Sequence, residues 1–453
     1  MTVRRLGWPL VLALAALLRL PSLDRPPLSE REAASAWSAL SAARGQSPPA
    51  LAGPPDSALL LSSQTFAFWF VDLPSPSVAR APAAMAGVVA VAAARLLSPW
   101  LGGTGALVLG FLVAVEPGWV AASRDGGGAM LAAACALLAL GALARIGARD
   151  DEGSRAWIAA FGGAVGALVT AGPLAWDLLP GVAAAMAATA WPSARSAGTR
   201  LLRFAGAGAL LAATTGLAQW TAVASVGESL RIWLSSWAAP RAETATELPV
   251  TALPLLVVAI AGLVGARIAL RSHRAVLVAI GVWGALSLLR PAPLDHAWLV
   301  ASFPLLIAAA RAAGPRMETL ERLSGRRGAL ARLATAVLAA LLLLPAARAS
   351  VAGDAGPNRP SAAWMELLAA DLRALQAARD EDGSVRRLEV VADPWSDPLL
   401  GWCLVDVAGV REVRSPSPAT AVERMVLARL GEEAILRSGD DRILGRYRLA
   451  ERR

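Results

Sequence analysis

The sequence contains no lysine, since all 43 of its basic residues are arginine. It also has only one tyrosine, two histidines and two cysteines. Cys135 lies inside an apolar run and Cys403 lies near the C-terminus, so the two indicate neither a disulfide nor a metal site. We interpret the use of arginine in place of lysine as codon bias, which carries no functional meaning.

The positive charge is not distributed as in a nucleic-acid-binding protein. The formal net charge is +9, but residues 353–453 hold 15 arginines against 17 acidic residues. The remaining 28 arginines and 17 acidic residues lie in the apolar part of the chain. Because nucleic-acid binding usually shows as a basic patch on a domain surface, this distribution argues against a nucleic-acid partner.

Long apolar runs fill the first 350 residues. A helix needs roughly 20 apolar residues to cross a bilayer core, and the alanine and glycine in these runs allow close helix packing in lipid. The sequence predicts an all-α polytopic membrane domain over 1–350, with about eleven transmembrane helices. The predicted spans are 6–22, 78–97, 101–120, 126–144, 156–171, 173–191, 204–224, 250–270, 275–289, 296–312 and 330–347.

The arginines also predict the orientation of these helices. With the N-terminus in the cytoplasm, the cytoplasmic segments hold 18 arginines against five acidic residues. The outer segments before residue 350 then hold 10 arginines against 12 acidic residues. Because arginines beside a span resist translocation, we expect a cytoplasmic N-terminus and an extracytoplasmic C-terminal region in a multi-pass protein of the cell membrane.

Two of the predicted outer connections are too long to be simple turns. The first, 23–77, holds an amphipathic stretch at Glu30–Ala43 and an apolar run at 59–71 that is too short to span. We expect both to form interfacial helices.

The second long connection is 225–249. It carries Trp233 and Trp237 at helical spacing, which indicates another helix lying at the interface. We interpret the two indoles as membrane anchors.

Residues 353–453 have the charge density of a soluble domain. Helices and strands alternate in its predicted order, which is typical of a small α/β domain. It contains no glycine-rich phosphate loop, metal-ligand spacing or Ser/His/Asp grouping, so we assign it no chemistry. The predicted helices are 362–378, 399–405 and 420–430, and the predicted strands are 387–392, 410–413, 434–437 and 443–449.

Four motifs stand at the predicted outer ends of helices. They are Arg19-Leu20-Pro21 with Pro27-Leu28-Ser29-Glu30-Arg31-Glu32-Ala33, Pro54-Pro55 with Arg80-Ala81-Pro82, Glu116-Pro117-Gly118 with Ser123-Arg124-Asp125, and Arg290-Pro291 with His296 and Phe303-Pro304. As an ordered set they resemble the GT-C superfamily of membrane glycosyltransferases, in particular its bacterial protein O-mannosyltransferase and aminoarabinose-transferase (PMT-like) branch. Arg31 stands where that family has an essential aspartate, and Glu32 follows it.

The resemblance implies transfer of a sugar from a polyprenyl-phosphate donor to a glycan, lipid or protein at the outer face. It implies carboxylates that deprotonate an acceptor hydroxyl and cations that hold the donor phosphate. The catalytic candidates are Glu32, Glu30, Asp125 and Glu116, and the candidates for donor-phosphate binding are Arg290, Arg80, Arg124 and His296. No metal site and no cofactor are predicted.

Each candidate also has a structural interpretation. Arg80 and Arg290 can snorkel to the membrane interface. Arg124 and Asp125 can form a local ion pair, or Asp125 can cap the helix that follows. The two glutamates of the first outer segment can form the solvated face of an interfacial helix.

Three functions therefore compete. A lipid-linked sugar transferase predicts that Glu30, Glu32 and Arg290 line one cavity. A non-catalytic GT-C-like subunit of an envelope-assembly complex is favoured by Arg31 at the aspartate position. A transporter is the weakest candidate, because ionisable residues in these spans cluster at the ends.

Overall fold

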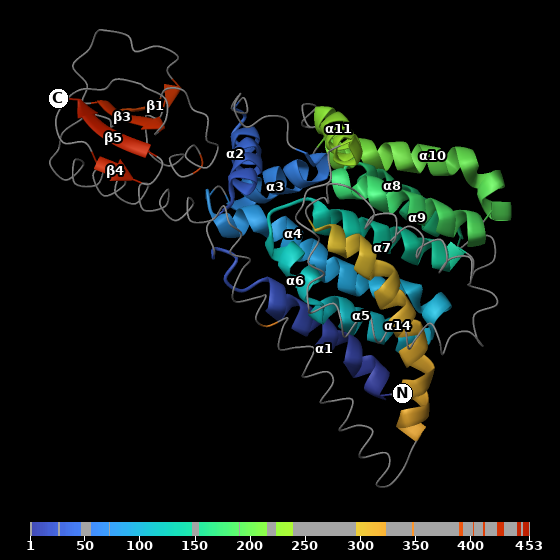
Figure 1. Cartoon of the computed structure of the whole chain (residues 1–453). Coiled ribbons are helices and arrows are strands. Elements are labelled where there is room, and N and C mark those ends of the chain that lie inside the picture. Colours follow the sequence, from blue (N-terminus) through green and yellow to red (C-terminus); the bar gives the residue numbers. More distant parts are fainter. Residues whose placement is uncertain are drawn as a thin grey trace. The chain divides into compact units, whose positions relative to one another are not determined.

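The computed structural model describes two compact units of the chain (Figure 1). The described residues are 2–25, 28–46, 56–71, 73–146, 154–189, 191–214, 223–238 and 296–322, with Ala347, Trp402 and five short strands nearer the C-terminus. Unit 1 comprises Met1–Leu23, Pro54–Phe66 and Arg80–Asp354, and unit 2 comprises Asp24–Gly53, Ala67–Ala79 and Ala355–Arg453.

Helices make up the described part of unit 1. α3 and α4 each continue into unit 2 at one end. The helices are α1 (Thr2–Arg19), α3 (Ala58–Val71), α4 (Pro76–Ala93), the short 3-10 helix η2 (Ala94–Leu97), α5 (Ser98–Val115), α6 (Pro117–Arg124), α7 (Ala129–Ile146), α8 (Ser154–Val169), α9 (Pro173–Thr189), α10 (Trp191–Ala213), α11 (Ala224–Ala238) and α14 (Ala297–Arg322).

Apolar helices account for most of the predicted spans that fall on described residues. The predicted span 204–224 was wrong at its start, because the helix there, α10, already begins at Trp191. Three stretches there are long and apolar enough to cross a membrane, namely Pro76–Val115, Ala129–Ile146 and Trp298–Pro315. Four shorter apolar helices are Gly7–Arg19, Ala58–Val71, Arg155–Val169 and Pro173–Ala187. The predicted spans 250–270, 275–289 and 330–347 lie outside the described residues.

The stretch Pro76–Val115 folds back on itself rather than running straight. Gly102 has a φ of 76°, a left-handed conformation that glycine adopts without steric cost. Beyond it, a Cβ placed on Gly110 of α5 would lie 3.6 Å from the backbone oxygen of Val91 in α4. α4 and α5 are therefore two separate helices that approach each other at Val91 and Gly110, as the predicted spans 78–97 and 101–120 require.

The second of those predicted spans was wrong at its end. α5 ends at Val115, and a separate short helix, α6, begins at Pro117. Proline lacks the backbone N–H and disfavours helical geometry in the residue before it, so Glu116 takes extended angles (φ −67°, ψ 122°). Because of this break, Glu116 is the N-cap residue of α6, and its side chain accepts a hydrogen bond from the Trp119 N–H.

Close backbone contacts hold the helices of unit 1 together. α14 packs on α5, where a Cβ on Gly105 would lie 3.2 Å from the backbone oxygen of Ala310. α8 packs on α10 through Gly162 and Gly166, which meet α10 backbone atoms directly. The apolar core draws its buried side chains from α1, α4 to α9 and α14.

In unit 2, α2 (Glu30–Ala43) has the bounds predicted for the amphipathic stretch. Its N-terminus is a capping box, in which Ser29 Oγ accepts from the Glu32 N–H and Glu32 Oε2 accepts from the Ser29 N–H at 2.7 Å. Trp402 of the C-terminal region packs on Phe68 of α3, with ring centroids 5.9 Å apart. The segment predicted to be the first outer connection therefore contributes α2 and the end of α3 to the same unit as the C-terminal region.

The C-terminal strands form one mixed sheet in the order β2-β1-β3-β5-β4. β1 pairs in parallel with β2 and β3, and β5 pairs antiparallel with β3 and β4. The strands are β1 (Glu389–Ala392), β2 (Arg411–Glu412), β3 (Arg424–Arg429), β4 (Arg442–Leu444) and β5 (Tyr447–Arg452).

Two predictions for this region were wrong. The helix predicted at 420–430 is strand β3, and the single strand predicted at 443–449 is divided between β4 and β5. Short apolar runs do not distinguish helix from strand, and pairing with a neighbouring strand decided both cases. The helix at 362–378 and the strand at 434–437 lie outside the described residues.

Candidate functional site

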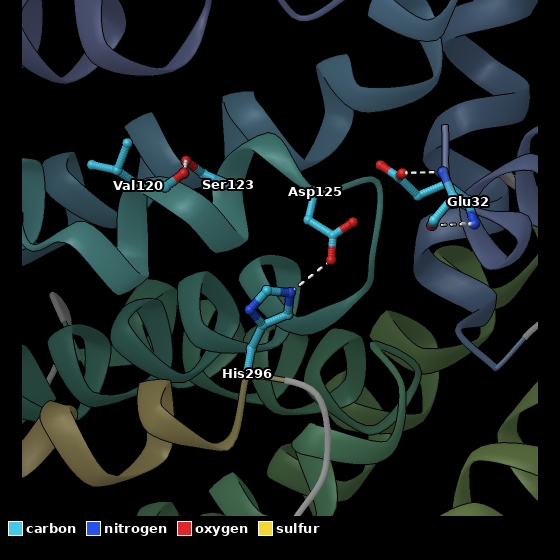
Figure 2. Close-up of polar contacts among 6 residues, drawn as sticks. Glu32, Val120, Ser123, Asp125 and His296 are labelled. Atoms are coloured by element: carbon cyan, nitrogen blue, oxygen red, sulfur yellow. Dashed lines mark hydrogen bonds and ion pairs between the residues drawn. The ribbon is translucent and has the colours of Figure 1, made fainter. Parts of the chain in front are cut away.

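Two of the predicted site residues meet in unit 1. His296 stands immediately before α14, and its Nε2 lies 2.6 Å from Oδ2 of Asp125, the residue that follows α6 (Figure 2). Both side chains reach the surface, with 22% and 28% of their areas exposed. The pair joins residues 171 positions apart, so the fold brings the third and fourth sequence motifs together.

Glu116 is almost fully buried and accepts hydrogen bonds on both carboxylate oxygens. Oε2 accepts from the backbone N–H of Trp119 at 2.7 Å, which caps α6. Oε1 accepts from the Trp298 indole N–H at 2.9 Å. With both oxygens bound to protein donors, this carboxylate holds the start of α14 against α6.

A second indole hydrogen bond connects the same two helices, with its donor on α6. Trp119 Nε1 donates to the hydroxyl of Ser302 at 2.9 Å, one turn farther along α14. The Trp119 ring also packs on Phe303 with centroids 5.8 Å apart. Both Trp119 and Ser302 are buried, so this contact belongs to the helix interface.

Two arginines predicted to bind phosphate, Arg80 and Arg124, donate hydrogen bonds to backbone carbonyls instead. Arg124 donates to the backbone oxygens of Pro21 and Ser22 at 2.7 and 3.0 Å, and Arg80 donates to that of Leu23 at 3.0 Å. These carbonyls follow the end of α1, where helical partners run out. Both arginines are therefore used to fix the segment after α1.

A third arginine, not predicted as a site residue, completes this arrangement. Arg19 is fully buried at the end of α1 and donates to the backbone oxygens of Val113 and Ala114, both at 2.8 Å. A Cβ on Gly87 would lie only 2.6 Å from Arg19 Nε, so α4 needs glycine there. Arg19 supplies donors to the last turn of α5.

Glu30 and Glu32 belong to unit 2. Glu32 is 3% exposed and holds the capping box of α2, whereas Arg31 is exposed. This burial places Glu32, rather than Arg31, on the covered face of α2. The side chain of Glu30 and the whole of Arg290 lie outside the described residues, so the predicted cavity of Glu30, Glu32 and Arg290 stays a prediction.

The second predicted long connection contains the helix α11, and a helix was expected there. Trp233 Nε1 donates to Oδ1 of the buried Asp177 at 2.9 Å, and Trp176 Nε1 donates to Ser229 Oγ at 3.0 Å. The indoles therefore tether α11 to α9, a role beyond the predicted anchoring at the membrane interface. Trp237 packs edge-on against Trp233 with centroids 6.2 Å apart.

Sequence reasoning overlooked the residues that align α6 with α14. Trp119, Trp298 and Ser302 lie in apolar helices and were not predicted to have a role. A buried indole N–H requires an acceptor, and that requirement was the signal available in the sequence. In the described part of the chain, no cluster of three or more His, Cys, Asp or Glu residues could hold a metal ion.

The chain shares its fold with the solved structures of ArnT and of an archaeal oligosaccharyltransferase, which confirms the expected resemblance at the level of the fold. The chain is similar to the crystal structure of ArnT from Cupriavidus metallidurans bound to undecaprenyl phosphate, with 15% identity, a TM-score of 0.66 and coverage of 100% of this chain and 98% of ArnT. The apo state of that ArnT gives a TM-score of 0.61, again at 15% identity, covering 99% and 98% of the two chains. The architecture and the apolar helices make the chain an integral membrane protein.

A second class of enzyme shares this architecture. The archaeal oligosaccharyltransferase AglB from Archaeoglobus fulgidus, in complex with an inhibitory peptide and a dolichol-phosphate, matches with 14% identity and a TM-score of 0.54. That match covers 90% of this chain but 64% of AglB. No protein-family model matches the chain, and no curated protein sequence matches it.

Proposed function

We propose that the protein is a membrane glycosyltransferase that moves a sugar from a polyprenyl-phosphate carrier to an acceptor at the outer face of the cell membrane. The observation that carries the proposal is the match to ArnT over the whole length of both chains. The ArnT structure holds undecaprenyl phosphate, and the AglB structure holds a dolichol-phosphate. Both ligands are polyprenyl phosphates, which supports a donor of that class here.

Among the candidate carboxylates, we assign the general base to Asp125. It is 28% exposed, so an acceptor hydroxyl can approach it, and its imidazole partner can hold it in one orientation. Glu116 and Glu32 are almost fully buried and accept hydrogen bonds from helix-end N–H groups. Those two carboxylates are better explained as helix caps.

The proposed reaction balances without a cofactor. The acceptor oxygen forms a bond to the anomeric carbon while its proton passes to Asp125. The bond between the anomeric carbon and the phosphate oxygen breaks, and polyprenyl phosphate leaves as the anion. Prepositioned cations stabilise the charge that develops on this leaving group.

Arg290 is our first candidate for that cation. Arg80 and Arg124 already donate to backbone carbonyls, which leaves them less free to turn toward a phosphate. Arg290 precedes His296 by six positions in the sequence, so it can serve the same site as Asp125. Its planar guanidinium suits bidentate binding of phosphate oxygens.

The proposal includes an orientation. A cytoplasmic N-terminus follows from the arginine bias and puts the loops that carry Asp125 and His296 on the outer face, together with residues 353–453 as a small α/β domain. The acceptor is then an envelope glycan, lipid or protein.

The test uses the full-length protein in nanodiscs with synthetic polyprenyl-phosphate sugars and an envelope extract as acceptor. We expect the wild type to release polyprenyl phosphate from the donor when the acceptor is present. Asp125→Asn should reduce it by about 100-fold or more, because an amide cannot take the proton. Asp24→Asn, which changes an exposed carboxylate in the same way, is the matched control and should stay active. Equal rates for the two variants would remove Asp125 from the mechanism.

A second candidate function is a non-catalytic GT-C-like subunit of an envelope-assembly complex. Arg31 at the family's aspartate position, and a capping role for the neighbouring Glu32, favour it. This function predicts that no donor is turned over, and that deletion phenotypes are rescued by Asp125→Asn as fully as by the wild-type chain.

A further inference from the structure

Three side-chain contacts connect α6 and its ends to the first turn and a half of α14. His296 meets Asp125 at 2.6 Å, Trp298 donates to Glu116 at 2.9 Å, and Trp119 donates to Ser302 at 2.9 Å. We call the last two hydrogen bonds the indole ladder. They are buried or half-buried, whereas the first lies at the surface.

We infer that Glu116 and Trp298 are positioning residues that hold His296 against Asp125 and so orient the carboxylate that takes the acceptor proton. This inference rests on the proposed function and goes beyond it, because it assigns a task to buried residues that touch no substrate. The indole ladder fixes the register of α14 relative to α6. His296 stands two residues before Trp298, so its position follows from that register.

The backbone of His296 supports this assignment. Its φ is 59°, a left-handed conformation that side-chain-bearing residues rarely adopt. Such a conformation persists where the surrounding structure enforces it, and such residues cluster at functional sites. The His296 carbonyl accepts from the Leu299 N–H at 2.8 Å, so α14 itself holds one side of the strained residue. The contact with Asp125 holds the other.

Gly118 shows how closely the indole must approach. A Cβ on Gly118 would lie 2.6 Å from Cδ1 of Trp298 and 3.1 Å from Oε2 of Glu116. The Trp298 ring therefore lies directly over the backbone of α6. Glu116 caps α6, Pro117 begins the helix, and Gly118 leaves room for the Trp298 indole. All three residues therefore contribute to the hydrogen bond between Trp298 and Glu116.

Positioning of His296 and simple helix packing predict different effects when the ladder is lost. If the ladder only added stability, its loss would weaken folding and leave the His296 contact as it is. If the ladder positions His296, loss of the ladder should not lower kcat further in a protein whose His296 has already been replaced. A double-mutant cycle measures this difference directly.

The kinetic test compares Trp298→Phe, His296→Gln and the double variant as full-length proteins in nanodiscs. We expect Trp298→Phe to lower kcat by about 10- to 100-fold with KM for the donor unchanged, as misplacement of a reacting group does. We expect the double variant to match His296→Gln alone. Additive losses in the double variant would overturn the inference. Trp157→Phe, which removes an indole that lies over Arg145, is the matched control and should keep wild-type kcat.

A chemical test does not depend on turnover. The chain has two histidines, His296 and His273, so carbethoxylation by diethyl pyrocarbonate can be followed at each by mass spectrometry. We expect the rate at His296, relative to His273, to rise several-fold in Trp298→Phe and Gly118→Ala, approaching that of Asp125→Asn. An unchanged rate in both variants would refute the positioning role.

The two tests fail in different ways. A wild-type protein with no transfer activity would refute the proposed function, while the modification rates would still decide whether the ladder holds His296. A wild-type protein that is active, with a double variant slower than His296→Gln, would refute the positioning role and leave the transferase intact. Melting temperatures of all variants show whether each still folds.

Discussion

Nη1 of Arg19 donates to the backbone oxygen of Ala114 at 2.8 Å, linking the last residue of α1 to the last turn of α5. Both residues are completely buried. The last carbonyls of a helix have no partner within it, and Arg19 supplies donors for two of them. A charged residue in an apolar environment is thus explained by the backbone acceptors around it.

We predict that Arg19→Met destabilises the protein. The substitution leaves two buried carbonyl oxygens without donors, at about 1–3 kcal/mol for each. Thermal unfolding in detergent should show a clear fall in Tm. Arg25→Met removes an exposed guanidinium and serves as the control, with little change in Tm expected. Similar melting temperatures for the two variants would contradict this account of Arg19.

We predict that Gly166→Ala weakens the packing of α8 on α10. The new Cβ would lie 2.1 Å from the backbone oxygen of Ala205 and 2.5 Å from the backbone nitrogen of Ala209, so the helices must separate. Overpacking of this kind costs about 1–3 kcal/mol. Gly206→Ala on α10 meets nothing within 4 Å and should be neutral or slightly stabilising. The two variants are compared by their melting temperatures. An equal change in Tm for Gly166→Ala and Gly206→Ala would refute the close contact between α8 and α10.

We predict that Ser29→Ala and Glu32→Gln differ. Alanine at position 29 removes the cap of α2, which costs about 1 kcal/mol and should speed hydrogen exchange in its first turn. Glutamine at position 32 keeps an acceptor for the Ser29 N–H and should leave exchange unchanged. Under the proposed function, Glu32→Gln also retains transfer. A large loss of transfer with normal exchange would instead identify Glu32 as the general base.

We predict that Trp233→Phe loosens α11. The change deprives the buried Asp177 of its indole donor, at a cost of about 1 kcal/mol. Amide hydrogen exchange in α11 should accelerate, while that in α9 should change little. Trp69→Phe, which alters an exposed indole on α3, provides the comparison. Unchanged exchange in α11 would show that the indole hydrogen bond is not what tethers this helix.

Several elements could be predicted from the sequence because their signals are local. Glu30–Ala43 is helical over its predicted range because Ser29 and Glu32 form a capping box that is readable in four consecutive residues. The apolar runs give helices α1, α7, α8 and α9 at their predicted places, since in lipid a helix satisfies its own backbone. The helix break at Glu116 was not predicted, although a proline at position 117 disfavours helical geometry in the residue before it.

The site depended on contacts that no local pattern contains. Asp125 and His296 were both predicted candidates, but no local pattern pairs them across 171 positions. Arg80 and Arg124 were predicted to bind phosphate because long cationic side chains suit it. In the structure both arginines donate hydrogen bonds to backbone carbonyls that follow the end of α1.

Composition and periodicity by themselves determined that this chain is an integral membrane protein built from apolar helices, because the bilayer imposes the same length and polarity on every span. The tertiary structure alone decided which polar side chains meet. Arg19, Arg124 and Trp298 each take the partner that the helix packing brings within hydrogen-bond distance. That choice depends on register between helices far apart in the sequence, as the indole ladder of Trp298, Glu116, Trp119 and Ser302 demonstrates.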